Sequence, residues 1–592
     1  MVPVKKSIAA AGTGRYGIKP GFLFCRTTWR KHGYATRTQA ARDLEHALFG
    51  PLGTDGDGPA QVAARLVHEQ GVSCEDIARA HLNRIEMLEP KLRSFLPNSV
   101  VQGRGTLADV VLEEARGHDR TLAKLVTAEE RRRALPLAGV TLGVKDNICA
   151  AGFRATAGSL ALSRYAPPRD ATVVDNLRRA GCVVVGKTLC DEFGMGSTTE
   201  SSASQLKDVV GSAATTRNPW DLSRVPGGSS GGSAAAVSSR QCALALGTDT
   251  GGSVRQPASF CGVVGLKPTY GRVSRFGLIA YASSLDVPGC FGSTAQDCAR
   301  MLDVIAGPDP ADSSSAALPH PPPLSEGGYE RLCRQVSGEG GDAKPLLGLK
   351  VGLVRETLRR DGTVEEGVLG AVDAASEALR GLGCEVKEVS LPAFDLSLPA
   401  YYVTAVSEAS SNLSRYDGLR YPAEVEAGEG EGGDEGFGGR SLMAQIASSR
   451  GSLLGDEPLR RILMGTYTLS EGYGDALYKR AQVARKRVQQ EMLARMVAGG
   501  GECDVLLTPT APTTAYACGD KELQDPLQMY LGDVMTVGVN LAGFPAVSVP
   551  AGMSLGLPVG VQVIGAPFEE GAILNVAHHL ERSLGLNLLP PL

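Results

Sequence analysis

The sequence lacks the features that are typical of membrane proteins, of nucleic-acid-binding proteins, and of folds stabilised by zinc or disulfides. No stretch approaches eighteen consecutive apolar residues, so we expect no membrane span. The net charge of −4 argues against a chain that holds nucleic acid through its own overall field. The thirteen cysteines form no CxxC pair, and no pair of histidines stands at ligand spacing. This pattern argues against a structural zinc site and favours reduced thiols in a reducing compartment.

Histidine is also scarce, which matters for catalysis. Gly227–Gly231 fits the G-x-S-x-G pattern of the nucleophile elbow in Ser–His–acid hydrolases. Of the eight histidines, however, none lies between His118 and His320. His320 falls in a proline-rich stretch, and His32 lies in a basic N-terminal segment. A distant histidine stays open, because catalytic triads assemble across the sequence, but another base is the better hypothesis.

Glycine, in contrast, is abundant: it accounts for 74 of 592 residues, against about 7% in typical proteins. Part of the surplus lies in two serine-containing stretches, Pro226–Ser233 and Asp249–Pro257. Glycine beside serine allows sharp turns and close substrate approach, and N–H groups around Thr250–Ser253 could stabilise an oxyanion. A flexible linker is the alternative. The apolar flanks Ala234–Val237 and Ala243–Leu246 instead indicate a structured unit.

Composition along the sequence predicts the domain boundaries and the inserts. Residues 1–42 carry nine basic residues and no acid before Asp43, which predicts a cleaved organellar transit peptide; a basic disordered tail is the alternative. We expect the folded chain to begin near residue 60 and to form a single domain through residue 592. Residues 307–345 and 426–439 are rich in glycine with proline, serine or acidic residues, and are predicted to be surface loops or inserts.

Helical patterns alternate with short β-branched runs along the chain, which predicts an α/β fold with helices on both faces of a sheet. Ser73 followed by Asp76 resembles a helix N-cap, and apolar residues recur at helical spacing from Ile77 to Leu88. The other predicted helices are Thr172–Ala180 and Glu365–Leu382, and the predicted strands are Cys182–Val185, Lys350–Val354, Cys384–Val389, Asp504–Leu507 and Val559–Ile564.

Gly181–Thr188 has the spacing of a phosphate-binding loop, G-x-x-x-x-G-K-T. Such a loop curls its backbone around phosphate, which needs residues that tolerate unusual backbone angles. The three consecutive valines between the glycines favour an extended strand. We therefore predict a strand here and no nucleotide site.

Lysine is the alternative base, because burial can lower its pKa. Lys145 ends a mostly apolar stretch, residues 137–144. To be uncharged near neutral pH its pKa must fall by roughly three units from about 10.4, which corresponds to about 4 kcal/mol. A carboxylate at Asp146 would oppose that fall. In an extended strand, however, adjacent side chains point to opposite faces.

Taken together, Lys145 in GVKDNI, Ser229 in PGGSSGGSAAA and Ser253 in DTGGSVRQPASFCG closely resemble the amidase signature family. The resemblance runs from about residue 60 to the C-terminus. It implies one α/β/α domain around a large mixed sheet. It also implies that Ser253 is the nucleophile, that Ser229 lies on a cis peptide bond and relays a proton to neutral Lys145, and that the N–H groups of Thr250, Gly251 and Gly252 hold the oxyanion.

Residues 265–286 and 408–421 are similar to the glutamine-hydrolysing A subunits of tRNA-dependent amidotransferases within this family. That similarity implies glutamine as substrate, with Arg461, Asp533 and Tyr401 in its pocket. The released ammonia would convert Glu-tRNA(Gln) to Gln-tRNA(Gln) in the mitochondrial matrix or chloroplast stroma. Partners B and C are implied, with tRNA, ATP and magnesium held mainly by B and no cofactor in this chain. The alternatives are a stand-alone amidase acting on a small or hydrophobic amide, and a catalytically silent scaffold.

Overall fold

The computed structural model describes residues 39–52, 57–97, 99–101, 103–202, 215–317, 327–336, 344–421, 442–497, 500–520 and 530–592. The predicted insert at 426–439 and most of the predicted transit peptide lie outside these residues. Within them, no helix is both long and apolar enough to cross a bilayer.

A ten-stranded mixed sheet forms the centre of the molecule, in the order β2-β1-β3-β5-β4-β9-β10-β8-β6-β7. Pairing is parallel at both ends of the sheet, where helices connect successive strands, and antiparallel in the middle. The strands are β1 Thr141–Lys145, β2 Val183–Thr188, β3 Leu244–Asp249, β4 Val264–Lys267, β5 Val287–Gly292, β6 Lys350–Val354, β7 Glu385–Val389, β8 Val505–Pro509, β9 Ala546–Ser554 and β10 Leu557–Gly565.

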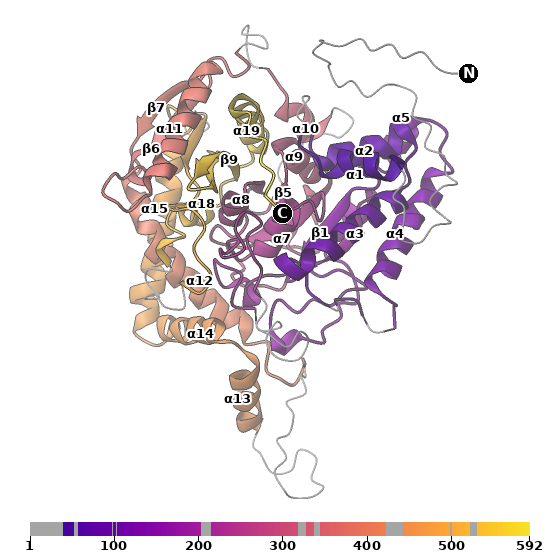
Figure 1. Ribbon diagram of the computed structural model, residues 1–592. Coiled ribbons are helices and arrows are strands. Elements are labelled where there is room, and N and C mark those ends of the chain that lie inside the picture. The colour runs from indigo at the N-terminus through magenta and orange to yellow at the C-terminus, as the bar shows by residue number, and fades with distance from the viewer. Residues whose placement is uncertain are drawn as a thin grey trace, which may run out of the picture.

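Helices surround this sheet (Figure 1), with α1–α5 gathered at one end of the molecule and α11 beside β6 and β7 at the other. The helices are α1 Gln39–Phe49, α2 Pro59–Gln70, α3 Cys74–Leu92, α4 Leu107–Leu122, α5 Ala128–Ala134, α6 Thr172–Arg179, α7 Gly231–Ser238, α8 Arg255–Cys261, α9 Ala295–Ile305, α10 Gly328–Cys333, α11 Glu366–Gly381, α12 Ser397–Leu413, α13 Leu442–Leu453, α14 Asp456–Leu469, α15 Lys479–Arg495, α18 Val537–Ala542 and α19 Glu570–Leu584. Shorter helical turns are η1 Leu160–Leu162, η2 Glu192–Gly194, η6 Arg355–Thr357, η7 Pro392–Leu396 and η8 Gly474–Tyr478.

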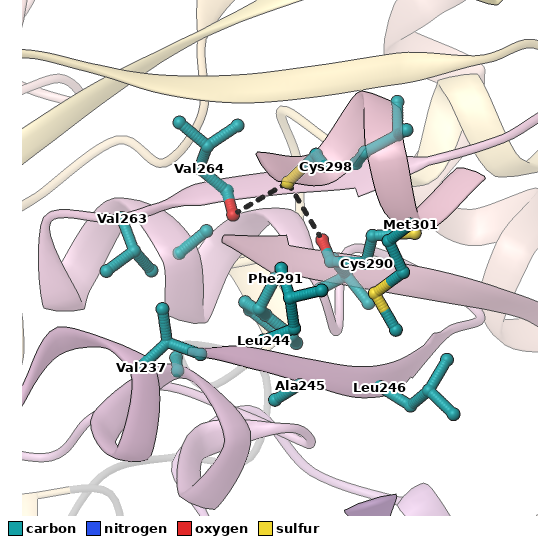
Figure 2. Close-up of a cluster of buried hydrophobic side chains, with 14 of the residues drawn as sticks. Val237, Leu244, Ala245, Leu246, Val263, Val264, Cys290, Phe291, Cys298 and Met301 are labelled. Atoms are coloured by element: carbon teal, nitrogen blue, oxygen red, sulfur yellow. Dashed lines mark hydrogen bonds between the residues drawn. The ribbon is translucent and has the colours of Figure 1, made fainter. Parts of the chain in front are cut away.

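Both faces of the sheet are covered. Neighbouring strand residues alternate between two buried clusters: Leu507 and Val563 belong to the larger one, and Leu506 belongs to the one completed by Val488 of α15. Figure 2 shows the larger cluster near the middle of the sheet, where side chains of β3, β4 and β5 pack with those of α7 and α9. The predicted α/β class, with a mixed sheet between helices, is confirmed.

Most predicted elements lie within one to three residues of the observed ones. Ser73 caps α3 by accepting from the N–H of Asp76 at 3.0 Å. Gly181–Thr188 contains β2, and its last three residues continue that strand, so the strand interpretation of this motif is confirmed.

Two boundaries differ from the prediction. Helix α1 lies before residue 60 and has two buried side chains, Leu44 and Leu48, so the last four residues of the predicted transit peptide are helical. The segment 307–345, predicted to be a surface loop, contains α10, whose Tyr329 and Cys333 are buried between α9 and α19. A helix of six residues is too short for periodicity to reveal among prolines and glycines.

Candidate active site

Three segments that are far apart in the sequence bring the predicted relay residues together. Lys145 is the last residue of β1, which pairs in parallel with β3. Ser253 follows the end of β3 in the turn that leads into α8. Ser229 precedes α7, and its peptide bond with Gly228 is cis, as the resemblance predicts. The serine segments touch directly, because the N–H of Ser230 donates to the carbonyl of Ser253 at 3.2 Å.

Lys145 is fully buried and lies among hydroxyl groups. Its Nζ lies 2.7 Å from Ser229 Oγ, 2.8 Å from Thr248 Oγ1 and 3.4 Å from the Thr248 carbonyl oxygen. Burial lowers the pKa of Lys145 to about 8, although nearby acidic groups, Cys190 and Asp191 first among them, act in the opposite direction. The amine is therefore partly neutral at the pH of an organelle interior.

The carboxylate of Asp146 does not contact that amine. It accepts hydrogen bonds from the backbone N–H groups of Thr156 and Gly158, each at 3.1 Å. Its ion-pair partner is the buried Lys187 of β2, at 3.5 Å. The two neighbours thus have separate partners, but the reason is not strand alternation: β1 ends at Lys145, and Asp146 lies in the turn that follows.

The loop Thr250–Gly252 lies beside Ser253 and is held at several points. The Thr250 hydroxyl donates to Asp286 at 2.8 Å, and the Gly252 N–H donates to Asp249 Oδ1 at 2.9 Å. Across the described parts of the chain, the N–H groups of Thr250 and Gly251 have no hydrogen-bond acceptor. Two of the three predicted oxyanion donors are therefore uncommitted, whereas that of Gly252 is engaged.

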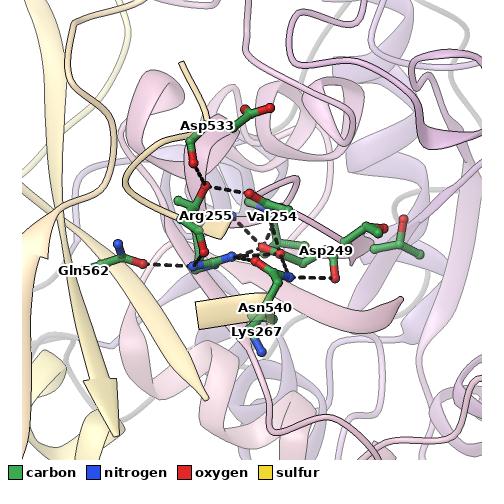
Figure 3. A network of polar contacts seen from close by, with 12 residues as sticks. Asp249, Val254, Arg255, Lys267, Asp533, Asn540 and Gln562 are labelled. Carbon is green, nitrogen blue, oxygen red and sulfur yellow. Dashed lines mark hydrogen bonds and ion pairs between the residues drawn. The ribbon is translucent and has the colours of Figure 1, made fainter. Parts of the chain in front are cut away.

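Behind this loop lies a buried ion pair (Figure 3). Arg255 donates through Nε and Nη2 to the two oxygens of Asp249, at 3.0 and 2.9 Å, and both side chains are fully buried. Gln562 of β10 accepts from Arg255 at 2.9 Å, and Asn540 of α18 donates to Asp249 at 2.8 Å. Arg255 holds the pKa of Asp249 well below its usual range despite burial. Asp249 is therefore a fixed anion that orients the backbone on which Ser253 lies.

The three predicted glutamine-binding residues gather near the same loop. Tyr401 of α12 packs against Gly251, where any β-carbon would overlap its hydroxyl. Arg461 of α14 is buried, and its Nε donates to Glu457 at 2.7 Å. Asp533 accepts from the hydroxyl of Tyr402, also on α12, at 2.8 Å.

Sequence reasoning missed the aromatic residues that surround Arg461. The guanidinium lies 5.5 to 5.9 Å from three tyrosine ring centres, and its Nη1 also donates to one of their hydroxyls, that of Tyr281. These tyrosines are Tyr281, Tyr402 and Tyr530. No local pattern relates them, because they come from three segments up to 249 positions apart. The adjacent pair Tyr401-Tyr402 was the only available signal.

Comparison with known proteins identifies the family of this chain. The family model described as Amidase matches residues 97–574. The chain belongs to the amidase family.

Within this family, the chain is similar to one group of subunits, as two relatives and one solved structure show. The chain is 51% identical over 522 residues to the A subunit of the chloroplastic/mitochondrial glutamyl-tRNA(Gln) amidotransferase of Arabidopsis thaliana, covering 87% of this chain and 88% of that protein. It is 45% identical to the A subunit of the glutamyl-tRNA(Gln) amidotransferase of Synechococcus elongatus, covering 89% and 99%. The crystal structure of the corresponding A subunit from Thermotoga maritima has a TM-score of 0.66 at 36% identity, covering 91% and 98%.

Proposed function

We propose that this chain is the glutamine-hydrolysing subunit of an amidotransferase that converts Glu-tRNA(Gln) to Gln-tRNA(Gln). The observation that carries the proposal is the buried contact of 2.7 Å between Lys145 Nζ and Ser229 Oγ. A neutral amine has two N–H donors and one lone pair. Thr248 offers two acceptors, its hydroxyl and its carbonyl, which leaves the lone pair for the hydroxyl proton of Ser229.

The reaction then proceeds by nucleophilic catalysis. Ser253 Oγ attacks the side-chain carboxamide carbon of glutamine, while its proton passes to Ser229 and the proton of Ser229 passes to Lys145. The developing oxyanion accepts from the N–H groups of Thr250 and Gly251, and also from that of Gly252 if it leaves Asp249. Return of a proton to the leaving nitrogen releases ammonia and leaves an acyl-enzyme, which water hydrolyses to glutamate.

The hydroxyl of Ser253 has no hydrogen-bond partner among the described residues, so the link from Ser229 to Ser253 is open in this structure. Catalytic hydrogen bonds are often long before substrate binds. We propose that glutamine closes this link when it fills the pocket beside the Thr250–Gly252 loop.

Recognition of the free amino acid needs a fixed cation and a fixed anion. Arg461 commits Nε to Glu457 and Nη1 to Tyr281, and Nη2 has no acceptor in the described part of the chain. We propose that Nη2 binds the α-carboxylate of glutamine, that Asp533 binds the α-ammonium, and that Tyr401 shapes the wall between them. The three tyrosine rings around Arg461 exclude water, which strengthens the ion pair with the substrate.

The relatives support a proposal about partners and location. The name of the Arabidopsis relative describes one subunit of a chloroplastic/mitochondrial amidotransferase, in line with the organellar transit peptide that residues 1–42 predict. We propose B and C subunits as partners, with tRNA, ATP and magnesium bound mainly by B and with no cofactor in this chain.

The test is glutamine hydrolysis by the complex purified with its partner subunits, followed as ammonia release with and without tRNA. Ser253→Ala is expected to abolish hydrolysis while assembly and unfolding temperature stay unchanged. Ser238→Ala is the matched control, because it removes another buried serine hydroxyl, one that donates to the Cys261 carbonyl at 2.7 Å. A chain that hydrolyses small or hydrophobic amides but ignores glutamine would instead be a stand-alone amidase. Assembly without any hydrolysis would indicate a scaffold.

A further inference from the structure

The peptide group between Gly251 and Gly252 is held from both sides. Its carbonyl accepts from the hydroxyl of Thr536 at 2.6 Å, and its N–H donates to Asp249 at 2.9 Å. A peptide group is planar, so two contacts on opposite sides fix the orientation of its plane. Any β-carbon on Gly252 would overlap Thr536. The hydroxyl of Thr536 therefore helps to set the direction of the N–H groups next to Ser253.

Thr536 is equally tied to the other end of the pocket. Its hydroxyl oxygen lies 3.1 Å from the carbonyl oxygen of Asp533, and its N–H donates to the same carbonyl at 3.0 Å. Its own carbonyl accepts from Arg255 at 3.2 Å. Thr536 is only 1% exposed, so water does not compete for its hydroxyl. One buried residue thus joins the turn that carries Asp533 to the loop that carries Gly251.

We infer that Thr536 is a positioning residue for glutamine hydrolysis, an inference that rests on the function proposed above. Through Gly251 it orients the oxyanion donors, and through the Asp533 turn it sets their distance from the α-ammonium of the substrate. A glutamine held at its α-ammonium then has its carboxamide at the oxyanion donors. Loss of the hydroxyl should weaken stabilisation of the transition state more than binding of the ground state.

The first experiment compares Thr536→Val, which keeps the shape and removes the hydroxyl, with Thr536→Ser, which keeps the hydroxyl. In the assembled complex we expect Thr536→Val to lower kcat for glutamine about 10- to 100-fold with KM changed less than about threefold, somewhat below the loss of one oxyanion donor. Thr536→Ser should retain kcat within about threefold of the wild type. Thr357→Val is the matched control, because it removes an equally buried hydroxyl that donates to the Val354 carbonyl at 2.8 Å, in the helical turn η6 that follows β6.

A second measurement does not depend on glutamine. A fluorophosphonate probe reacts when Ser253 Oγ forms a bond to phosphorus and fluoride leaves, with the serine proton passing through Ser229 to Lys145, and the probe's phosphoryl oxygen takes the place of the oxyanion. Thr536→Val should slow labelling of Ser253 about tenfold, and the control Thr357→Val should leave the labelling rate unchanged. If the wild type ignores glutamine, the proposed function fails, yet the labelling rates still test Thr536.

Two outcomes would overturn the inference. One is that Thr536→Val matches the wild type in both kcat and labelling rate. The other is that Thr536→Ser loses as much as Thr536→Val, which would mean that volume and not the hydroxyl matters. If Thr536→Val does not fold, Thr536→Ala removes the same hydroxyl without a branched side chain, and rates are normalised to titrated active sites.

Discussion

The pH dependence of glutamine hydrolysis tests the central physical claim, that Lys145 works as a neutral amine. Burial lowers the pKa of Lys145 to about 8. Because the neutral form accepts the proton, activity falls as pH falls through that value and levels off above it. A group with this pKa is about 9% neutral at pH 7 and about 90% neutral at pH 9, so kcat/KM should rise roughly tenfold between these values. An amine with an unperturbed pKa would instead give about a hundredfold rise that continues past pH 10.

The assay is initial-rate ammonia release at subsaturating glutamine from pH 6 to pH 10, at constant ionic strength. Other buried groups titrate in this range and need a control. Burial also lowers the pKa of Lys267, to about 7. Lys267 binds the Pro268 carbonyl at 3.0 Å and, within the described residues, makes no hydrogen bond to the relay hydroxyls. Lys267→Met should therefore leave the rise in activity near pH 8 at the same pH. Thr248→Val, which removes one acceptor of the Lys145 amine, should shift that rise to lower pH because the cation loses a stabilising contact.

Three results would refute the reasoning about Lys145. Activity that still rises severalfold between pH 9 and pH 10 would show an amine that is cationic in the resting enzyme. A rise that moves with Lys267→Met would belong to that lysine. A flat profile from pH 6 to pH 10, with Ser253 still labelled by an acylating probe, would show that proton transfer to Lys145 does not limit the reaction.

Two further predictions concern the charged residues of the site. Arg461→Ala should raise KM for glutamine about 10- to 100-fold with a smaller effect on kcat, because it removes ground-state binding of the α-carboxylate. The measurement is steady-state kinetics, and an unchanged KM would show that the pocket is assigned wrongly. Asp249→Asn should lower the free energy of unfolding by about 3–5 kcal/mol, because it leaves the fully buried Arg255 without its counter-ion. Denaturant unfolding measures this change, and a curve that matches the wild type would contradict this account of the ion pair.

Local chemistry in the sequence predicted much of this structure. The run of valines in Gly181–Thr188 identified a strand, because the stiffness of branched side chains acts residue by residue. The expectation that Asp146 points away from Lys145 rested on an extended segment, whereas β1 ends at Lys145 and Asp146 lies in the turn that follows. The environment of Arg461 could not be predicted in the same way, because Tyr281 and Tyr530 reach it only through the tertiary fold. The hydrogen bond from the Gly252 N–H to Asp249 could not be predicted either. A glycine-rich stretch does not specify which of its N–H groups already have an acceptor.

Two buried lysines on neighbouring strands show how the same side chain acquires different chemistry. Lys187 of β2 lies among oxygens that carry full or partial negative charge: the carboxylate of Asp146 and the carbonyls of Asp146, Ile148 and Arg154, at 2.7 to 3.5 Å. Such a set stabilises an ammonium in the protein interior. Lys145 of β1 has mainly two hydroxyls, which can accept from an ammonium but can equally donate to an amine. Lys187 forms an ion pair with Asp146, which is the residue after Lys145 in the sequence. This carboxylate therefore does not act on the Lys145 amine. The base of the reaction is thus the lysine whose neighbours tolerate the loss of its charge.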